Sequence, residues 1–288
     1  MAEISASVVV KLRKMSGQGM MDCKKALEET NGDMDQAMGI LRKKGLATLA
    51  RRAERETSEG AVVSWLSDDG KEAALATLCC ETDFVAKSDD FIKLAQDIRD
   101  YLGIAGGSQG AETVLQTIIA GKTFQEVLTE VVSRTGEKMQ VGDYARFRLE
   151  GAGLIGTYIH FNKKVGSMVQ IETSDAKVAQ APSVKQAAAD IAMHITASKP
   201  LALDVASLDP QVIEREKEIY AAQVQNKPPE VVNRIVEGKL KKFYSEYCLL
   251  EQPFVKDDSK TVQQMLADAA KQAGGQASVK QFVRFEVG

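Results

Sequence analysis

The fold class follows from residues 61–80, which read AVVSWLSDDGKEAALATLCC. Two short β-favouring runs, AVVSWL and AALATLCC, flank Asp68-Asp69-Gly70, and a turn sequence between such runs predicts a β-hairpin. Further strand-like runs cover residues 144–149, 156–161, 166–172 and 278–287. Helical patterns lie between the strands, with links of hairpin length, so the sequence predicts an α+β fold rather than a doubly wound parallel sheet. The order of the elements predicts two related α+β halves with antiparallel sheets.

The first 45 residues are predicted to form three short helices, because apolar residues recur there every three or four positions between glycine-containing turns. Asp33 is predicted to cap the third helix, which is expected to end at Gly45. The following segment, residues 51–56, is charged and has no apolar face. It is predicted to be a linker between the helical module and the rest of the chain.

A helical arm is predicted in the second half. Asp209-Pro210 is a strong start signal, because it places an N-cap residue before a proline at the first helical position. This helix is expected to run to about Gln225, and Pro228-Pro229 then turns the chain into a second helix that ends near Tyr244. Two charged helices joined by a few residues predict an antiparallel arm. The resulting domain division is 1–50, 56–148, 149–200 together with 245–288, and the insertion 201–244.

Composition excludes several classes of protein. The chain has 288 residues and carries 37 basic against 40 acidic side chains, a net charge of −3, which disfavours a nucleic-acid binder of the whole-surface type. No apolar run approaches the roughly 20 residues that a membrane helix needs, and the first residues do not resemble a signal peptide, so a cytoplasmic protein is expected. The cysteines are predicted to be reduced thiols without a metal. They are Cys23, Cys79, Cys80 and Cys248.

The residues themselves reveal no catalytic or cofactor site. Gly121-Lys122-Thr123 resembles the end of a phosphate-binding loop, but Gln116 stands where such a loop needs its first glycine. Thr123 is better explained as the cap of the next helix, since Glu126 follows at the capping-box spacing. His194 is predicted to be a packed structural histidine, and His160 a surface contact. An enzyme that uses Gly121-Lys122-Thr123 to bind a nucleotide stays the weaker alternative.

Residues 80–87, CETDFVAK, connect a predicted strand to a predicted helix. An aromatic residue in such a connection is usually buried, and the pattern alone therefore favours Phe84 as a core residue. The alternative is an exposed wedge that inserts into a partner, because buried aromatic residues dominate the energy of protein interfaces.

Several segments together resemble bacterial elongation factor Ts, the guanine nucleotide exchange factor of elongation factor Tu. They are residues 19–27 (GMMDCKKAL) with 31–33 (NGD), 81–87 (ETDFVAK), 191–194 (IAMH) with 197–200 (ASKP), and 252–255 (QPFV). The similarity extends from Ala2 to the final residues RFEV. The combination and order of these segments are specific, although each is unconvincing alone.

The resemblance implies a non-enzymatic exchange factor without cofactor or metal, which binds elongation factor Tu and promotes release of its GDP. It implies an N-terminal module like a ubiquitin-associated domain, two α+β core subdomains and an inserted antiparallel coiled coil. It also implies an exposed Phe84 that enters the partner's G domain, within a segment that helps to dislodge the magnesium ion beneath GDP. The residues implied to contact the partner are Thr82, Asp83, Phe84 and Val85, with Met20, Met21, Lys24, Gly136 and His160 elsewhere. A general module for ubiquitin-like partners is a further alternative, but it leaves residues 82–85 unexplained.

Overall fold

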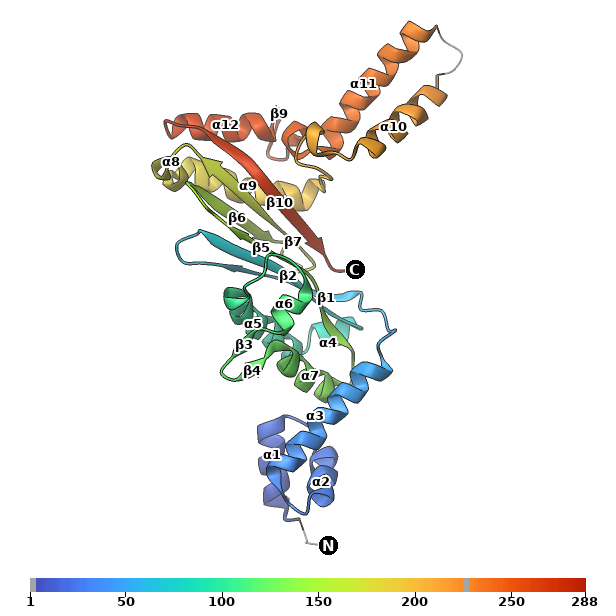
Figure 1. Cartoon of the computed structure of the whole chain (residues 1–288), viewed down its shortest axis with the longest axis vertical. Coiled ribbons are helices and arrows are strands. Elements are labelled where there is room, and N and C mark those ends of the chain that lie inside the picture. Colours follow the sequence, from blue (N-terminus) through green and yellow to red (C-terminus); the bar gives the residue numbers. More distant parts are fainter. Residues whose placement is uncertain (1–3, 225–227) are drawn as a thin grey trace.

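Two antiparallel sheets packed against each other form the centre of the protein, which has an α+β fold (Figure 1). The computed structural model describes residues 4–224 and 228–288. Three helices stand at the N-terminal end of this elongated molecule, and a helical arm projects from the opposite end. The strands of the two central sheets are β1 (Glu59–Leu66), β2 (Glu72–Cys80), β5 (Met139–Arg148), β6 (Gly153–Ile159), β7 (Val165–Thr173) and β10 (Ala277–Glu286).

The first sheet has the strand order β1-β2-β5. Strands β1 and β2 form the predicted hairpin, with Ala61 opposite Leu78, and Gly70 adopts a positive φ of 69° in the turn. After intervening helices, β5 returns and pairs antiparallel with β2. The hairpin at residues 61–80 is therefore confirmed as the framework of the first half.

The second sheet repeats this plan. Strands β6 and β7 pair as a hairpin, and β10 returns after more than 100 residues to pair with β7, giving the order β10-β7-β6. In both halves the third strand thus lies beside the second strand of a hairpin. The two halves expected from the order of elements therefore share the same strand topology.

The two sheets share a core, because β2 is buried on both faces. Ala73 and Leu75 pack with residues of the second sheet such as Met168, whereas Leu78 on the other face packs against the helices of the first half. A strand buried on both sides needs a continuous apolar run, which is what AALATLCC supplies.

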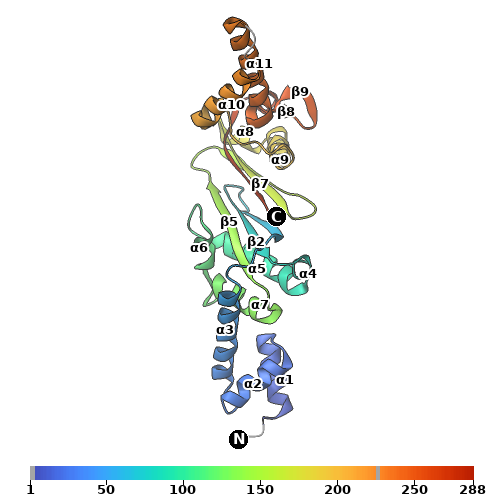
Figure 2. The same cartoon turned by 90° about the vertical axis from the view of Figure 1, so that its right-hand side faces the viewer.

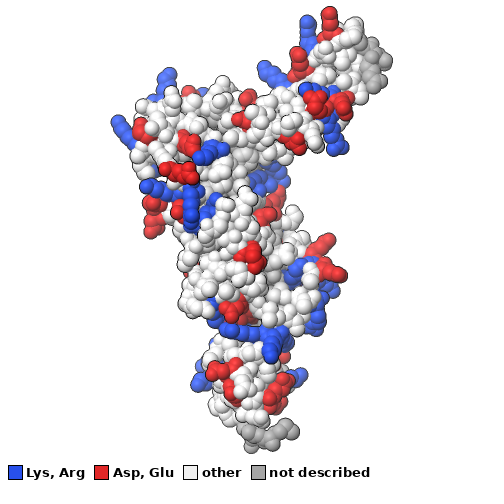
Figure 3. Space-filling model, in the orientation of Figure 1, with Lys and Arg blue, Asp and Glu red and all other residues white. Residues whose placement is uncertain are grey.

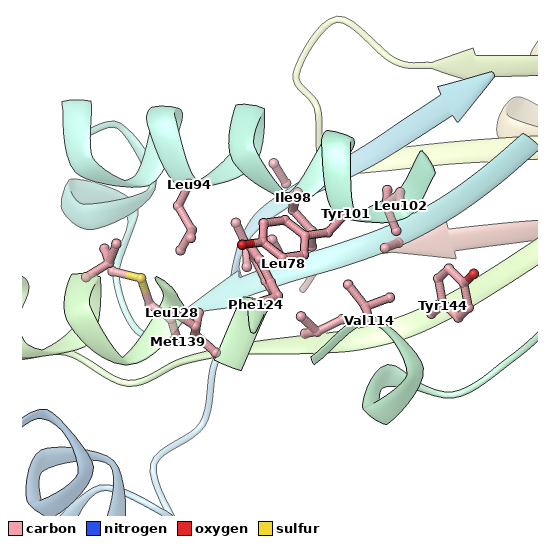
Figure 4. Close-up of a cluster of buried hydrophobic side chains, with 14 of the residues drawn as sticks. Leu78, Leu94, Ile98, Tyr101, Leu102, Val114, Phe124, Leu128, Met139 and Tyr144 are labelled. Carbon is pink, nitrogen blue, oxygen red and sulfur yellow. The ribbon is translucent and has the colours of Figure 1, made fainter. Parts of the chain in front are cut away.

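Helices cover the outer face of each sheet. The first sheet is covered mainly by α5 and α7, and Figure 4 shows Leu94, Ile98, Phe124 and Leu128 from these helices converging on Leu78 of β2. The second sheet is covered by α9 and α12, whose apolar residues form a separate cluster with it. The helices are α5 (Asp89–Ile104), α6 (Ala111–Leu115), α7 (Phe124–Thr135), α8 (Ala176–Gln180), α9 (Pro182–Ser198) and α12 (Val262–Gln272).

Short strands and turns complete the two halves. The short strands are β3 (Ile118–Ile119), β4 (Lys122–Thr123), β8 (Pro253–Phe254) and β9 (Asp257–Thr261), and the one-turn helix α4 spans Asp83–Ala86. Gly121 lies in the turn between β3 and β4, and Thr123 caps α7 in a capping box with Glu126. The Lys122 ammonium pairs with Glu130 at 2.8 Å. Turn and cap geometry thus accounts for the segment that resembles a phosphate-binding loop.

The N-terminal helices are α1 (Ala6–Ser16), α2 (Met20–Glu29) and α3 (Met34–Arg51). They enclose a small core of their own around Leu12, Leu27 and Leu41. The expected end of the third helix at Gly45 is wrong, because α3 continues six residues further. Gly45 is buried against α7, where it permits close packing of the two helices instead of ending α3.

The arm consists of α10 (Pro210–Ala222) and α11 (Pro229–Tyr247), which pack antiparallel and project from the second half (Figures 1 and 2). A proline occupies the start of each helix, as the sequence predicts. The expected end of the first helix, Gln225, lies outside the described residues. Three expectations stay predictions: that the arm is a coiled coil, that the N-terminal module is like a ubiquitin-associated domain, and that the domains divide at the positions given above.

Candidate partner-binding site

Phe84 is exposed, so the expectation from its pattern alone, a core residue, is wrong. The residue retains 84% of its accessible surface. It lies on α4, a single helical turn that stands out from the side of the first half (Figure 2). Val85 and Ala86 of the same turn pack against the core of that half. Because a single turn directs its side chains to different sides, burial of these two residues leaves Phe84 in solvent.

Hydrogen bonds hold this turn at its N-terminal end. Val85 donates its backbone N–H to Thr82 Oγ1 at 3.3 Å, which makes Thr82 the N-cap of α4. The Thr82 hydroxyl in turn donates to Glu137 Oε1 at 2.9 Å, and the Thr82 backbone N–H donates to Glu137 Oε2 at 3.2 Å. At the other end, Ser88 donates its hydroxyl to the Val85 carbonyl at 2.7 Å.

The residue before the cap is equally constrained. Glu81 pairs with Arg52 at 2.6 Å and accepts the backbone N–H of Lys138 at 2.6 Å. Burial acts to raise the pKa of Glu81, but the Lys138 amide and the Arg52 guanidinium outweigh it and hold the pKa below its usual range. Burial raises the pKa of the neighbouring Cys80 thiol to about 12, so this cysteine stays protonated and unreactive near neutral pH.

Asp83 points into solvent beside Phe84. It pairs with Lys87 one turn later at 2.7 Å, and the hydrogen bond from Lys87 lowers the pKa of Asp83. Both partners are exposed, so the pair adds little to stability and its carboxylate is accessible to a partner. Thr82, Asp83, Phe84 and Val85 thus form one braced turn with a ring and a carboxylate on its outer side.

The remaining predicted residues occupy three other places. Met20, Met21 and Lys24 lie exposed on α2, with Met21 at 62% exposure, while the opposite face of this helix is buried in the N-terminal core. Gly136 ends α7 with φ of 73°, and open space surrounds the position that a Cβ would occupy. His160 lies in the turn after β6, and its Nδ1 is 3.3 Å from the Tyr158 hydroxyl.

Two hollows lie near some of these residues. A polar pocket of about 350 Å³ is lined by Asp22 of α2, by residues of α3 and by Gly136, so the end of α7 faces the N-terminal module. A groove of about 320 Å³ has Ala86 of α4 on one side and Ile159 and Lys163 of the β6–β7 hairpin on the other. Positive side chains gather around the junction of α3 with the core (Figure 3). Asp22 of α2 and Gly136 thus line one hollow, and α4 and the β6–β7 hairpin line the other.

Phe161 is a feature that the sequence patterns did not single out as exposed. Its side chain is 87% exposed, and its ring lies 4.3 Å from that of His160. The chain offered a signal, because Asn162-Lys163-Lys164 after the strand indicates a turn, where side chains point to solvent. His194 by contrast is buried and bonded to Gln252 and Val255, as its predicted structural role requires.

Comparison with known proteins identifies the family. The family model described as elongation factor TS matches residues 81–288. The chain belongs to the elongation factor Ts family. It is therefore a translation elongation factor, as the resemblance implies.

Relatives in this family cover the whole chain. Elongation factor Ts of Clostridium perfringens (strain SM101 / Type A) is 40% identical over 99% of this chain and 93% of its own length. The protein of the same name from Desulfovibrio desulfuricans is 40% identical over 100% of this chain and 99% of its own length. That from Nitratiruptor sp. is 42% identical over 99% and 93%. The N-terminal helices, which precede the residues matched by the family model, thus fall within the region shared with these relatives.

We also searched the structure for a metal-binding cluster and for a membrane-spanning helix. Within residues 4–224 and 228–288, no cluster of three or more His, Cys, Asp or Glu side chains is arranged to hold a metal ion. Within the same residues, no helix combines the length and apolar character needed to cross a membrane.

Proposed function

We propose that this elongation factor binds elongation factor Tu in its GDP-bound and nucleotide-free states and promotes release of GDP. The observation that supports this most directly is the exposed Phe84 on a turn braced from both ends. Moving a large apolar ring from water into a pocket of a partner is favourable. Such buried aromatic side chains supply much of the energy of protein interfaces. The protein acts through binding and catalyses no chemical reaction.

The proposed mechanism is a coupling between two binding events on elongation factor Tu, the binding of this protein and the binding of GDP. A protein that binds the nucleotide-free partner more tightly than the GDP-bound partner must weaken GDP binding by the same factor. A magnesium ion in the partner would help to hold the nucleotide phosphates there, so its loss would weaken GDP binding. The Thr82–Val85 segment acts at this point by displacing the ion from the partner, with Phe84 as the wedge and Asp83 beside it.

The other predicted contacts steady the complex. Met20, Met21 and Lys24 present an amphipathic surface on α2 that braces the G domain, and Gly136 and His160 add contacts on the core. Because each contact supplies only part of the coupling, several must act together. We place this activity in the cytoplasm, with no nucleotide, nucleic acid or membrane bound by this protein itself.

The test is the variant Phe84→Ala in a stopped-flow assay of fluorescent GDP release from elongation factor Tu. Exchange is expected to fall at least about tenfold, because an interface anchor typically contributes more than 2 kcal/mol. The fold is expected to survive. With 84% exposure, the ring hides only about 30 Å² of a surface near 200 Å², worth about 0.8 kcal/mol.

A matched control lies seven residues further along the chain. Phe91 is 2% exposed and belongs to the core, so Phe91→Ala is expected to cost about 3–5 kcal/mol of stability. Unchanged GDP release by Phe84→Ala would refute the wedge. The role of the ion is tested by adding excess chelator, which should shrink the difference in rate between wild type and Phe84→Ala. A ratio that stays the same with and without magnesium would remove the ion from the mechanism.

A further inference from the structure

The Phe84 turn is held by a reciprocal arrangement of two dipeptides, Glu81-Thr82 and Glu137-Lys138, which we name the reciprocal clamp. Glu81 accepts the backbone N–H of Lys138, and Glu137 accepts the backbone N–H of Thr82. Each dipeptide thus supplies a carboxylate to the backbone of the other. The clamp begins where the sheet ends, since Cys80 and Met139 form the last pair between β2 and β5.

The clamp also reaches the N-terminal module. Arg52, which follows the last residue of α3, donates to both carboxylate oxygens of Glu81, at 2.6 and 2.9 Å. The Lys138 ammonium donates to the carbonyls of Ala53 and Arg55, at 2.7 and 2.9 Å. The end of α3, the start of α4 and the loop after α7 therefore meet at one point.

This point matters because α4 cannot fix its own orientation. It has four residues, and a single helical turn is unstable without outside contacts, since nucleation of a helix is unfavourable. Thr82 links the turn to the clamp, because its hydroxyl accepts from Val85 and donates to Glu137. Packing of Val85 and Ala86 on the core leaves Phe84 on the solvent side of the turn, and the clamp adds a second constraint on its direction, through a carboxylate 53 residues away in the chain and the end of α3.

We infer that the reciprocal clamp is a positioning element, which fixes Phe84 relative to the N-terminal helices so that a partner meets both surfaces in one geometry. Glu137 is its central positioning residue, because it satisfies both the hydroxyl and the backbone N–H of the α4 cap. The expected effect on GDP release rests on the proposed function, whereas the ordering of the turn is a property of the free protein. Glu137 and Glu81 are both only partly buried, at the edge of the first core.

The test compares Glu137→Gln with Glu150→Gln, which removes the same charge from the exposed β5–β6 connection. In the free protein, Glu137→Gln should raise hydrogen exchange of the bonded amides of Thr82, Val85 and Ala86 about tenfold or more, while Glu150→Gln leaves them unchanged. In the GDP-release assay, kcat/KM should fall several-fold for Glu137→Gln and by no more than for Phe84→Ala, because a misdirected ring can lose at most what the ring itself contributes to the interface.

A double variant separates positioning from general damage. In the Phe84→Ala background, Glu137→Gln should change GDP release less than twofold, because no ring is left to position. An equal loss in both backgrounds, or a full rate despite a loosened turn, would overturn the inference. Should Glu137→Gln fail to fold, Glu81→Gln carries the same comparisons. If the wild type does not accelerate GDP release from elongation factor Tu at all, the proposed function fails, and amide exchange alone still decides whether the clamp orders the turn.

Discussion

Two glycines of helix α3 offer a sharp test of how the N-terminal module is joined to the core. The same substitution, glycine to alanine, should have opposite signs at Gly39 and Gly45. Within a helix, alanine is more favourable than glycine by up to about 1 kcal/mol, because glycine loses more backbone freedom on folding. At Gly39 the Cβ that alanine would add has no neighbour within 4 Å among the described residues, apart from the adjoining residues and the backbone of its own helix, so Gly39→Ala should stabilise the protein by about 0.5–1 kcal/mol.

At Gly45 the added Cβ meets helix α7. It would lie 2.6 Å from the Thr129 carbonyl oxygen, 2.9 Å from the Thr129 Cγ2 and 3.0 Å from the Ser133 Cβ. A carbonyl oxygen within a helix cannot move unless the helix moves. Inserting a methyl group into such a contact typically costs about 1–3 kcal/mol, which exceeds the gain in helix propensity. Gly45→Ala should therefore destabilise the protein by about 1–2 kcal/mol.

The consequences extend to the module's attachment. The single hydroxyl hydrogen of Ser133 is shared between two acceptors, the Leu41 carbonyl at 3.3 Å and Gln18 Oε1 at 3.2 Å, so separation of α3 from α7 also loosens these contacts. Unfolding by urea, followed by circular dichroism, measures both variants under one protocol. Equal stabilisation by Gly39→Ala and Gly45→Ala would refute the close approach of the two helices.

Two other features of the chain yield predictions. Ala120 and Gly121 form a two-residue turn with φ of 50° and 79°. A left-handed conformation is costly for alanine, and asparagine adopts it more readily, so Ala120→Asn should raise the free energy of unfolding by about 0.5–1 kcal/mol. No gain in stability in a urea titration would contradict this. Burial lowers the pKa of His194, against the opposing effect of its bond to Gln252. The unfolded histidine, with a pKa near 6.5, takes up a proton first, so stability should be lost as pH falls from about 7 through the folded-state pKa. An NMR titration that places the pKa of His194 at or above 6.5 would contradict this sign.

Local patterns predicted much of the fold, because their causes lie within a few residues. The hairpin of β1 and β2 follows from a turn sequence between apolar runs, and Thr123 with Glu126 forms the capping box that its spacing indicates. The proline after Asp209 starts α10 for the same kind of local reason. In each case the partner atoms are neighbours in the chain, so sequence alone contains the interaction.

Predictions failed where a distant segment decides the outcome. Gly45 has the residue type that ends helices, but its environment is set by α7, some 80 residues later, and the helix continues. Phe84 has the residue type that fills cores, but the core position beside it is already occupied by Val85 and Ala86. The general tendency of large apolar residues to be buried cannot tell which member of one turn is left outside.

Phe84 can be recognised from the sequence, whereas the residues that hold its turn cannot. Phe84 stands within a motif that identifies the family, so resemblance alone is enough to mark it. Glu137 follows the glycine that ends α7 and, by its pattern, is an ordinary polar residue of a loop. Only the pairing of Cys80 with Met139 brings Glu137 beside Thr82, and register between strands far apart in sequence depends on the whole packed sheet. On the proposed function, a motif therefore names the side chain that contacts the partner, whereas the direction of that side chain depends on hydrogen bonds to other segments, which form only when β2 and β5 have paired.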